Sequence, residues 1–375
     1  MKLKDICKFV NEKVDTSSFH LEDYVSTENL LPNKGGVTVA SKIPQGKATL
    51  FKKGDILISN IRPYFKKIYL AKKQGCCSND VLCIRPNSNI PSSYLYYLLS
   101  QDSFFDYVMT GAKGTKMPRG DKGLIMNWAV YQSTLSQQQN IAEILAPLDD
   151  KIAVNSRICA NLEAQAEALF KSWFVDFTPF KDQPFVDSEL GPIPQGWKVG
   201  TLFDVANLHD RYRRPLSSNQ RSLMAKKYPY YGATSLMDFV EDYIFDGEYV
   251  LMGEDGSVVT EKGYPFIQYV WGKIWVNNHA HVLSGKDGFP TELLIPFVKT
   301  YNIKGLVTGA VQAKLNQANM AQIQIPIPPK ENINNISVII KSIYKKYRLL
   351  TEENQRLAAL RDTLLPKLMS GEIKL

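Results

Sequence analysis

The chain has 375 residues, of which 44% are hydrophobic and 22% charged, and its formal net charge is +8 at pH 7. This composition is ordinary for a folded globular protein and excludes a disordered chain. No apolar run approaches the roughly 20 residues of a membrane span, and the N-terminus has no apolar signal-type core, so we expect a cytoplasmic protein. The five cysteines form no C-x-x-C pair, which predicts neither a disulfide framework nor a metal site.

The first globular stretch, residues 1–135, mixes predicted strands and short helices. Strands are expected over 55–59 and 81–84, and a helix over 92–99. After a glycine-containing loop, the apolar residues 124–131 predict another strand. The stretch holds 19 Lys and Arg against 11 Asp and Glu, a surplus that suits a polyanion but equally describes a solvated surface.

A coiled-coil helix is predicted over residues 136–176, where apolar positions alternate in steps of four and three. Ser136 is the candidate N-cap, and Pro147 predicts a kink or a restart inside the helix. The seam positions are Ile141, Leu145, Leu148, Ile152, Asn155, Leu162, Leu169 and Trp173.

A linker rich in proline and glycine, residues 177–197, separates this helix from a second globular stretch, residues 198–330. A second helix with the same alternation follows over 331–370, offset from the first by a constant 195 residues. Its seam positions are Ile336, Ile340, Ile343, Tyr347, Leu350, Asn354, Leu357, Leu364 and Leu368.

The globular stretches repeat each other as well. The matched segments are GDILIS (54–59) with GEYVLM (247–252), CSNDVLCIRP (77–86) with VNNHAHVLSG (276–285), Thr110-Gly111-Ala112 with Thr308-Gly309-Ala310, and Lys116 with Lys314. One fold used twice explains this collinear order. We therefore predict an α+β chain of two tandem α/β globular domains, separated by two long antiparallel coiled-coil helices and related by a pseudo-twofold internal repeat.

The antiparallel direction follows from chain connectivity, because the second helix must start near the point where the first one ends. Full overlap then pairs Asn155 with Asn354 in the middle of the seam, a polar layer of the kind that fixes register. The same register sets Leu148 against Arg361, which is an imperfect match.

Three further segments complete the pattern: LSQQQNIAEILAPLDDKIAVNSRICANLEAQAEALFKSWFVDFTPF at 135–180, GPIPQGW at 191–197 and NQRLAALRDTLLPKLMSGEI at 354–373. In this order, over essentially its whole length, the chain resembles the specificity subunit of type I restriction-modification systems. The resemblance implies two target recognition domains, each reading one half of a bipartite, asymmetric double-stranded DNA target. It also implies that the helices set the spacing and dock two methyltransferase subunits and, through them, restriction subunits. S-adenosylmethionine and ATP are then expected on those partner subunits.

Catalytic motifs are missing from the sequence. It contains no phosphate-binding loop of the G-x-x-x-x-G-K-[ST] type and no Asn-Pro-Pro or Asp-Pro-Pro-aromatic motif for base methylation. His279 and His281 share one face of a predicted strand, where hydrogen-bonded structural histidines are favoured over a metal ligand or a base. We expect a non-catalytic subunit; the alternatives are a protein scaffold with a coiled-coil spacer and a complete enzyme with an unrecognised site.

For DNA contact we favour basic and amide residues in loops, because Arg and Lys bind guanine and phosphate while Asn and Gln pair with adenine. In the first domain these are Asn60, Arg62, Lys66, Lys67, Lys113, Lys116 and Arg119. In the second they are Arg211, Arg213, Arg214, Lys226, Lys227, Gln312, Lys314, Asn316 and Gln317. Solvated surface charge is an equally good interpretation of each residue taken singly.

Overall fold

The computed structural model describes residues 1–309 and 312–375, which divide into two compact units. Unit 1 consists of Met1–Asn155 and Glu352–Leu375, and unit 2 of Ser156–Thr351. We call the globular part of unit 1 module 1 and that of unit 2 module 2. Ala310, which the sequence repeat pairs with Ala112, lies outside the described residues. Within the described ranges, no helix is long and apolar enough to cross a membrane.

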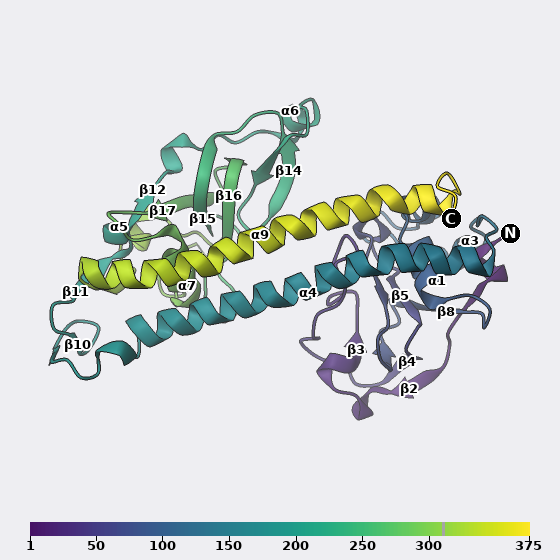
Figure 1. The fold of residues 1–375 in the computed structure, drawn as a ribbon, viewed down its shortest axis with the longest axis horizontal. Helices are drawn as coiled ribbons and strands as arrows, with labels where there is room; N and C mark the ends of the chain where they lie inside the picture. Colours follow the sequence, from purple (N-terminus) through teal and green to yellow (C-terminus); the bar gives the residue numbers. More distant parts are fainter. Residues whose placement is uncertain (310–311) are drawn as a thin grey trace. The chain divides into compact units, whose positions relative to one another are not determined.

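Two helices of 40 residues each, α4 (Leu135–Phe174) and α9 (Lys330–Met369), form the coiled coil (Figure 1). Helix α4 begins after Thr134, whose side-chain oxygen accepts a hydrogen bond from the backbone N–H of Gln137 at 3.3 Å. The Gln137 side chain in turn accepts one from the backbone N–H of Thr134 at 2.9 Å. This reciprocal capping box makes the predicted cap at Ser136 wrong, since Ser136 lies inside the helix.

Pro147 lies within α4 without ending it, so of the two predicted outcomes the restart is wrong and the kink stays a prediction. A proline inside a helix removes one hydrogen bond and costs about 3 kcal/mol. Its neighbours offset that cost, because Leu145 is fully buried and Leu148 packs against the same hydrophobic core of unit 1.

Each unit contains segments of both helices, which pack against each other there. In unit 1 Asn155 bonds to Asn354 at 3.0 Å, the pair that the antiparallel register predicts. In unit 2 Ala166 shares a core with Ile336 and Ile340. None of the predicted seam residues is exposed. The expected mismatch at Leu148 is avoided, because Arg361 donates instead to Asp149 at 2.6 Å.

Module 1 is built on two four-stranded sheets, of strand order β1-β8-β5-β6 and β2-β4-β7-β3. The strands are β1 (Cys7–Phe9), β2 (Lys13–Asp15), β3 (Tyr24–Val25), β4 (Lys47–Phe51), β5 (Ile56–Ser59), β6 (Ile68–Leu70), β7 (Gly75–Cys77) and β8 (Val81–Pro86). The helices are α1 (Ser92–Leu99), α2 (Asp102–Thr110) and α3 (Lys122–Met126), with 3-10 turns η1 (Leu3–Asp5), η2 (Thr16–Ser18), η3 (Leu21–Asp23) and η4 (Pro63–Phe65). The strands predicted at 55–59 and 81–84 and the helix at 92–99 are confirmed.

The strand predicted over residues 124–131 is wrong, since this segment begins within helix α3. The Asp121 side chain accepts a hydrogen bond from the backbone N–H of Leu124 at 2.9 Å, which caps a helical turn at this point. The apolar residues that follow make only an isolated bridge, between Ala129 and Lys2.

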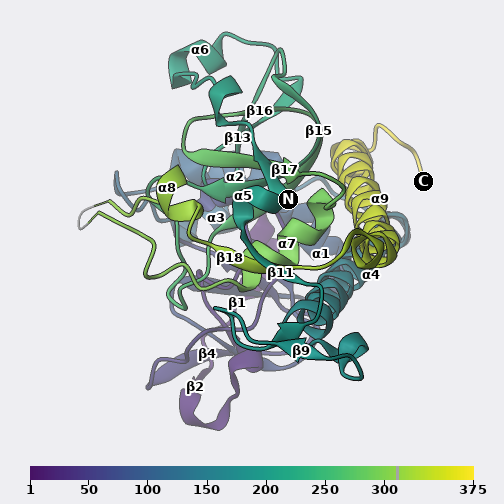
Figure 2. The same cartoon turned by 90° about the vertical axis from the view of Figure 1, so that its left-hand side faces the viewer.

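Module 2 is built on a six-stranded sheet of order β12-β17-β15-β16-β13-β14. Its strands are β12 (Ala206–Leu208), β13 (Tyr228–Tyr231), β14 (Leu236–Val240), β15 (Phe245–Gly253), β16 (Ile267–Val276) and β17 (Ala280–Gly285). Two small sheets flank it, β9 (Phe185–Val186) with β10 (Ile193–Pro194), and β11 (Lys198–Thr201) with β18 (Gln324–Ile327). The helices are α5 (Leu202–Val205), α6 (Ser218–Ser222), α7 (Thr291–Thr300) and α8 (Gln317–Met320), with 3-10 turns η5 (Thr178–Phe180) and η6 (Asp210–Tyr212). Helix α7 packs against the large sheet (Figure 2).

The strand ladders show how the two modules correspond. Cys7 pairs with Pro86 in module 1, and Ala206 pairs with Gly285 in module 2, which confirms the match of 77–86 with 276–285.

The predicted match of 54–59 with 247–252 is wrong by one residue. Ile56 pairs with Ile84, whereas Val250 pairs with Leu283, so Ile56 corresponds to Val250. Both are fully buried. A slip of one position would turn each side chain to the opposite face of its sheet, which is why burial distinguishes the two alignments.

Candidate nucleic-acid interface

In module 1 a loop of residues 113–119, loop A, is fixed to the end of strand β5 by backbone hydrogen bonds. Asn60, the first residue after β5, donates to the carbonyl of Asp80 at 2.8 Å and accepts from the N–H of Gly120 at 3.2 Å. Arg62 donates from its backbone to Pro118 at 2.8 Å. These bonds hold the loop and the strand end as one frame.

Module 2 repeats this frame with different residues. Glu254, the first residue after β15, donates to the carbonyl of His279 at 2.8 Å and accepts from the N–H of Leu315 at 3.0 Å. Gly256 donates from its backbone to Ala313 at 3.0 Å. The loop held in this way, residues 312–317, is called loop B.

At each loop a pair of backbone bonds sets the correspondence between the two modules. Lys113 and Arg119 exchange bonds of 3.0 and 2.9 Å, and Thr308 and Lys314 exchange bonds of 2.9 and 2.8 Å. Arg119 therefore corresponds to Lys314 and Lys113 to Thr308, so the predicted matches of Lys116 with Lys314 and of Thr110 with Thr308 are each wrong by three residues. Each module places a basic residue at this same position.

A short helix follows each loop and begins at an equivalent cap. Asp121 caps α3, and Asn316 caps α8 by accepting a hydrogen bond from the N–H of Asn319 at 2.8 Å. The cap side chain fixes the direction in which the chain leaves the loop. Asn316 therefore has a local structural role besides the DNA contact predicted for it.

Gly120, just after loop A, packs closely against neighbouring side chains. A Cβ atom at this position would lie 2.9 Å from Oδ1 of Asn60 and 2.8 Å from Cγ1 of Val108. Asn60 and Arg62 are half-buried beside it, and Oδ1 of Asn60 and Nε of Arg62 are buried without a hydrogen-bond partner among the described residues. Asn60 and Arg62, both predicted site residues, thus each have a buried polar atom next to loop A.

The side chains of the three loop A cations, Lys113, Lys116 and Arg119, are exposed. Arg119 lies 3.0 Å from Asp80, and Lys113 lies 4.0 Å from Asp121. Ion pairs this exposed contribute little stability, so these cations remain available to an anionic ligand.

Lys66 and Lys67 hold the β5–β6 turn in place and do not join the loop A cations. Lys66 pairs with Asp102 at 2.9 Å, and Lys67 donates to the carbonyl of Thr27 at 2.6 Å. Burial lowers the pKa of Lys67. Their contacts indicate a structural role for both.

Apart from Arg213, the predicted residues of module 2 fall into three groups. Gln312, Lys314, Asn316 and Gln317 belong to loop B, and Gln317 donates to Asp210 at 3.0 Å. Arg211 and Arg214 are exposed within and just after the 3-10 turn η6, with the guanidinium of Arg211 over the ring of Tyr212. Lys226 pairs with Asp238 at 2.8 Å, and the Lys227 ammonium lies over the ring of Tyr228. The last two lysines thus support strands β13 and β14.

Arg213 is engaged inside module 2. Its guanidinium donates to Glu254 at 2.6 Å and to the carbonyl of Ala280 at 2.7 Å, and it lies 3.2 Å from Asp210. Only 11% of its side chain is exposed. The sequence indicated the charge of Arg213 correctly but not its inward direction.

Asp210, Glu254 and His281 form an acidic and histidine cluster that sequence reasoning missed. Each offers one possible ligand atom, and these atoms lie within 4.8 Å of one another. Arg213 already neutralises both carboxylates, so the cluster is satisfied by a protein cation. Asp210 and His281 are 71 residues apart in sequence, and no local motif could have linked them.

Burial raises the pKa of Asp210, but hydrogen bonding and charge outweigh it. The imidazole of His281, the guanidinium of Arg213 and the backbone N–H of Val282 together hold the pKa of Asp210 below its usual value. Asp210 is therefore an ionised acceptor at the centre of the cluster.

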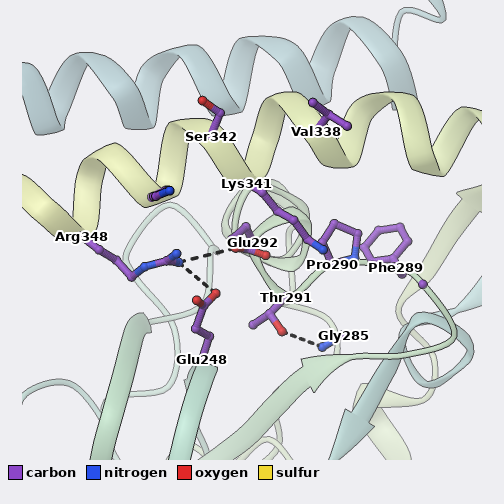
Figure 3. A pocket seen from close by; sticks show the side chains of 12 residues that line it. Glu248, Gly285, Phe289, Pro290, Thr291, Glu292, Val338, Lys341, Ser342 and Arg348 are labelled. Carbon is purple, nitrogen blue, oxygen red and sulfur yellow. Dashed lines mark hydrogen bonds and ion pairs between the residues drawn. The ribbon is translucent and has the colours of Figure 1, made fainter.

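A second charged site lies in unit 2, between α9 and the segment from Gly285 to Glu292, beside a cavity of about 670 Å³ (Figure 3). Arg348 of α9 approaches Glu248 at 2.9 Å and Glu292 at 3.5 Å. Burial and the neighbouring Glu248 carboxylate raise the pKa of Glu292. This site fastens α9 to module 2 and lies apart from loop B in the chain.

The whole arrangement matches a known family. The model of the type I restriction modification DNA specificity domain matches residues 1–164 and 194–359, so the chain belongs to this family. The family that its sequence resembles is thereby confirmed.

Similar proteins carry the same description. A putative type I restriction enzyme specificity subunit of Haemophilus influenzae is 38% identical over 148 residues, which are 40% of this chain and 37% of that protein. The MjaIX specificity subunit of Methanocaldococcus jannaschii is 24% identical over 94% of this chain and 85% of its own length. The crystal structure of the type I restriction-modification S subunit from M. genitalium has a TM-score of 0.58 at 16% identity and covers 98% of this chain and 95% of that one. It has the same fold.

Proposed function

We propose that each module reads one half of a bipartite DNA sequence, residues 1–135 forming the first reading module and 198–330 the second. The observation that carries this is the duplicated loop frame, which presents Arg119 in one module and Lys314 in the other at equivalent positions. Basic side chains on fixed loops neutralise phosphates and reach guanine edges. Neighbouring loop residues differ between the modules, which supports two unlike half-sites.

In this proposal the coiled coil sets the distance between the half-sites and docks two methyltransferase subunits, which in turn carry restriction subunits. The chain itself is a non-catalytic subunit that acts in the cytoplasm, while S-adenosylmethionine and ATP bind its partners. Base flipping and methyl transfer then belong to the methyltransferase.

Selection from a pool of random DNA duplexes tests the proposal. The chain, assembled with its methyltransferase subunits, is expected to retain duplexes that share two short unlike blocks at a fixed gap. Retained duplexes without a shared motif would contradict it. Methyl transfer from labelled S-adenosylmethionine is expected only when the partner is present; transfer by the purified chain alone would contradict the non-catalytic role.

A further inference from the structure

His281 lies on strand β17, and only 1% of its side chain is exposed. Its Nε2 atom lies 2.7 Å from the carbonyl oxygen of Leu315 in loop B, and its Nδ1 atom lies 2.6 Å from Oδ2 of Asp210. A carbonyl oxygen can only accept a hydrogen bond, so Nε2 carries a proton and donates it to Leu315.

The second ring nitrogen must also donate. Asp210 accepts from the N–H of Val282 at 3.0 Å and from the side-chain amide of Gln317 at 3.0 Å, and it pairs with Arg213 at 3.2 Å. So many donors around one carboxyl group require the ionised form, which has no proton to offer. Nδ1 of His281 therefore also donates its hydrogen bond, to Asp210.

This pair of residues binds loop B at two points. His281 holds the backbone at Leu315, and Asp210 holds the side chain of Gln317. Lys314 precedes the first of these points, and its side chain remains 49% exposed. The two contacts thus fix the backbone from which the loop's basic side chain projects.

In module 1 the position equivalent to His281 holds no ionisable side chain. The ladder pairs Leu82 with Ile58 in module 1 and His281 with Met252 in module 2, so Leu82 occupies the position of His281. Leu82 belongs to an apolar core. Loop A relies there on Gly120, which packs directly on Asn60.

We propose that His281 and Asp210 are positioning residues, a charged latch that holds loop B of module 2 in the conformation that reads its half-site. This inference rests on the proposed DNA-reading function. Reading of the other half-site by module 1 is independent of the latch. The role of His281 is to act on DNA through Leu315 and its neighbours, without touching the DNA itself.

The test uses the full chain assembled with its methyltransferase subunits and a selected bipartite duplex, with either half-site scrambled in turn. The variants are His281→Gln, Asp210→Asn and the double variant. In His281→Gln the amide N–H replaces the bond to Leu315, but the amide oxygen then faces the Asp210 carboxylate. In the double variant the Asn amide N–H donates to that oxygen and restores a hydrogen bond between the two positions, but it replaces the oxygen that accepts from Gln317, so recovery is expected to be partial.

Each single variant is expected to lower discrimination at one half-site by about tenfold, the scale of a lost charge-assisted hydrogen bond, and to leave the other half-site within about twofold. The affected half-site is the one weakened by Lys314→Ala and not by Arg119→Ala. The double variant is expected to discriminate the affected half-site at least about threefold better than it would if the losses of the two single variants combined independently. The reason is that the effects of substitutions at contacting residues are coupled. Additive effects would overturn the latch and leave only a packing role.

Leu251→Ala is the matched control, because Leu251 is fully buried on strand β15 of the same sheet and belongs to a different hydrophobic core from Leu315 of loop B. It is expected to lower the Tm of the complex but to keep discrimination below the melting transition. Equal loss of discrimination in this control at equal folded fraction would overturn the inference. If the wild-type complex discriminates neither half-site, the proposed function itself fails; if it discriminates both and His281→Gln does too, only the latch fails.

Discussion

The side-chain amide of Asn155 donates a hydrogen bond to the side-chain oxygen of Asn354 at 3.0 Å, and Asn155 is completely buried. The same nitrogen also donates to Glu353 at 2.8 Å. A polar pair within an apolar seam costs stability, but it penalises every register that separates the two asparagines. This layer therefore specifies how α4 and α9 align in unit 1.

Replacement of both asparagines by leucine is expected to raise the Tm by a few degrees while the helices lose their unique register. The measurements are thermal unfolding and amide hydrogen exchange, which should become faster next to the layer. Asn161→Leu, on an exposed position of α4, serves as the control and should change neither. Unchanged Tm and unchanged exchange in the double variant would show that the layer has no specifying role.

Arg361 and Asp149 form a largely buried ion pair that should contribute strongly to the stability of unit 1. Asp149 and Asp362 raise the pKa of Arg361 against the opposing effect of burial, so the guanidinium stays charged. Arg361→Met leaves Asp149 with the hydroxyl of Tyr97 as donor, at 2.9 Å. We expect a loss of about 3 kcal/mol in the free energy of unfolding, the usual cost of breaking a buried pair from one side.

Urea denaturation at fixed ionic strength measures this loss. Arg157→Met is the matched control, since Arg157 is exposed on α4, and it should change the free energy of unfolding by less than about 0.5 kcal/mol. Equal effects of the two substitutions would refute the assignment.

Glu292 predicts a pH dependence of stability in unit 2. Its pKa is raised from an ordinary value of 4.5, so the folded state binds its proton more tightly than the unfolded state does. Stability should therefore fall as the pH rises from 4.5 through the raised pKa of the folded protein. Glu292→Gln is expected to be more stable than the wild type at pH 7 and equal to it below pH 4.5.

Denaturation curves at several pH values measure the difference between Glu292→Gln and the wild type. A variant that is less stable than the wild type at pH 7 would show that the ion pair with Arg348 outweighs burial. The Asp246→Asn variant offers a control on an exposed carboxylate of the same module. It should show no comparable gain.

Arg119 and Lys314 should make equivalent contributions to DNA affinity. Arg119→Ala and Lys314→Ala are each expected to weaken binding and to reduce the slope of log affinity against log salt by about one. Lys116→Ala should do the same if its exposed side chain meets a phosphate. Lys67→Ala, whose half-buried ammonium donates to the carbonyl of Thr27, is the control and should keep the wild-type slope.

The helices and the repeat could be predicted from sequence because their signals are periodic. A step of four and three residues needs no tertiary information, and it placed Asn155 opposite Asn354 correctly. The cap was missed because Thr134 and Ser136 offer the same hydroxyl chemistry two residues apart. Of the two outcomes predicted for Pro147, only the restart was wrong, because burial of its neighbours offsets its local cost.

The interface could be predicted only in part. Composition identified Arg213 as a cation but could not reveal that it points into module 2, towards Glu254. Alignment of the weak repeat shifted Lys314 onto Lys116, because identical lysines were matched without the backbone bonds that make Arg119 its counterpart. The direction of the Arg213 side chain and the alignment of Lys314 with Arg119 both depend on tertiary contacts, which the local sequence of these loops does not show.

Sequencing of modified bases in genomic DNA tests the central claim most directly. A host that expresses this chain with its methyltransferase subunit is compared with a strain that lacks the chain. The account predicts a new bipartite motif, two short unlike halves around a fixed gap, that is present only with the chain. Absence of any such motif, from a chain and partner shown to assemble, would contradict it.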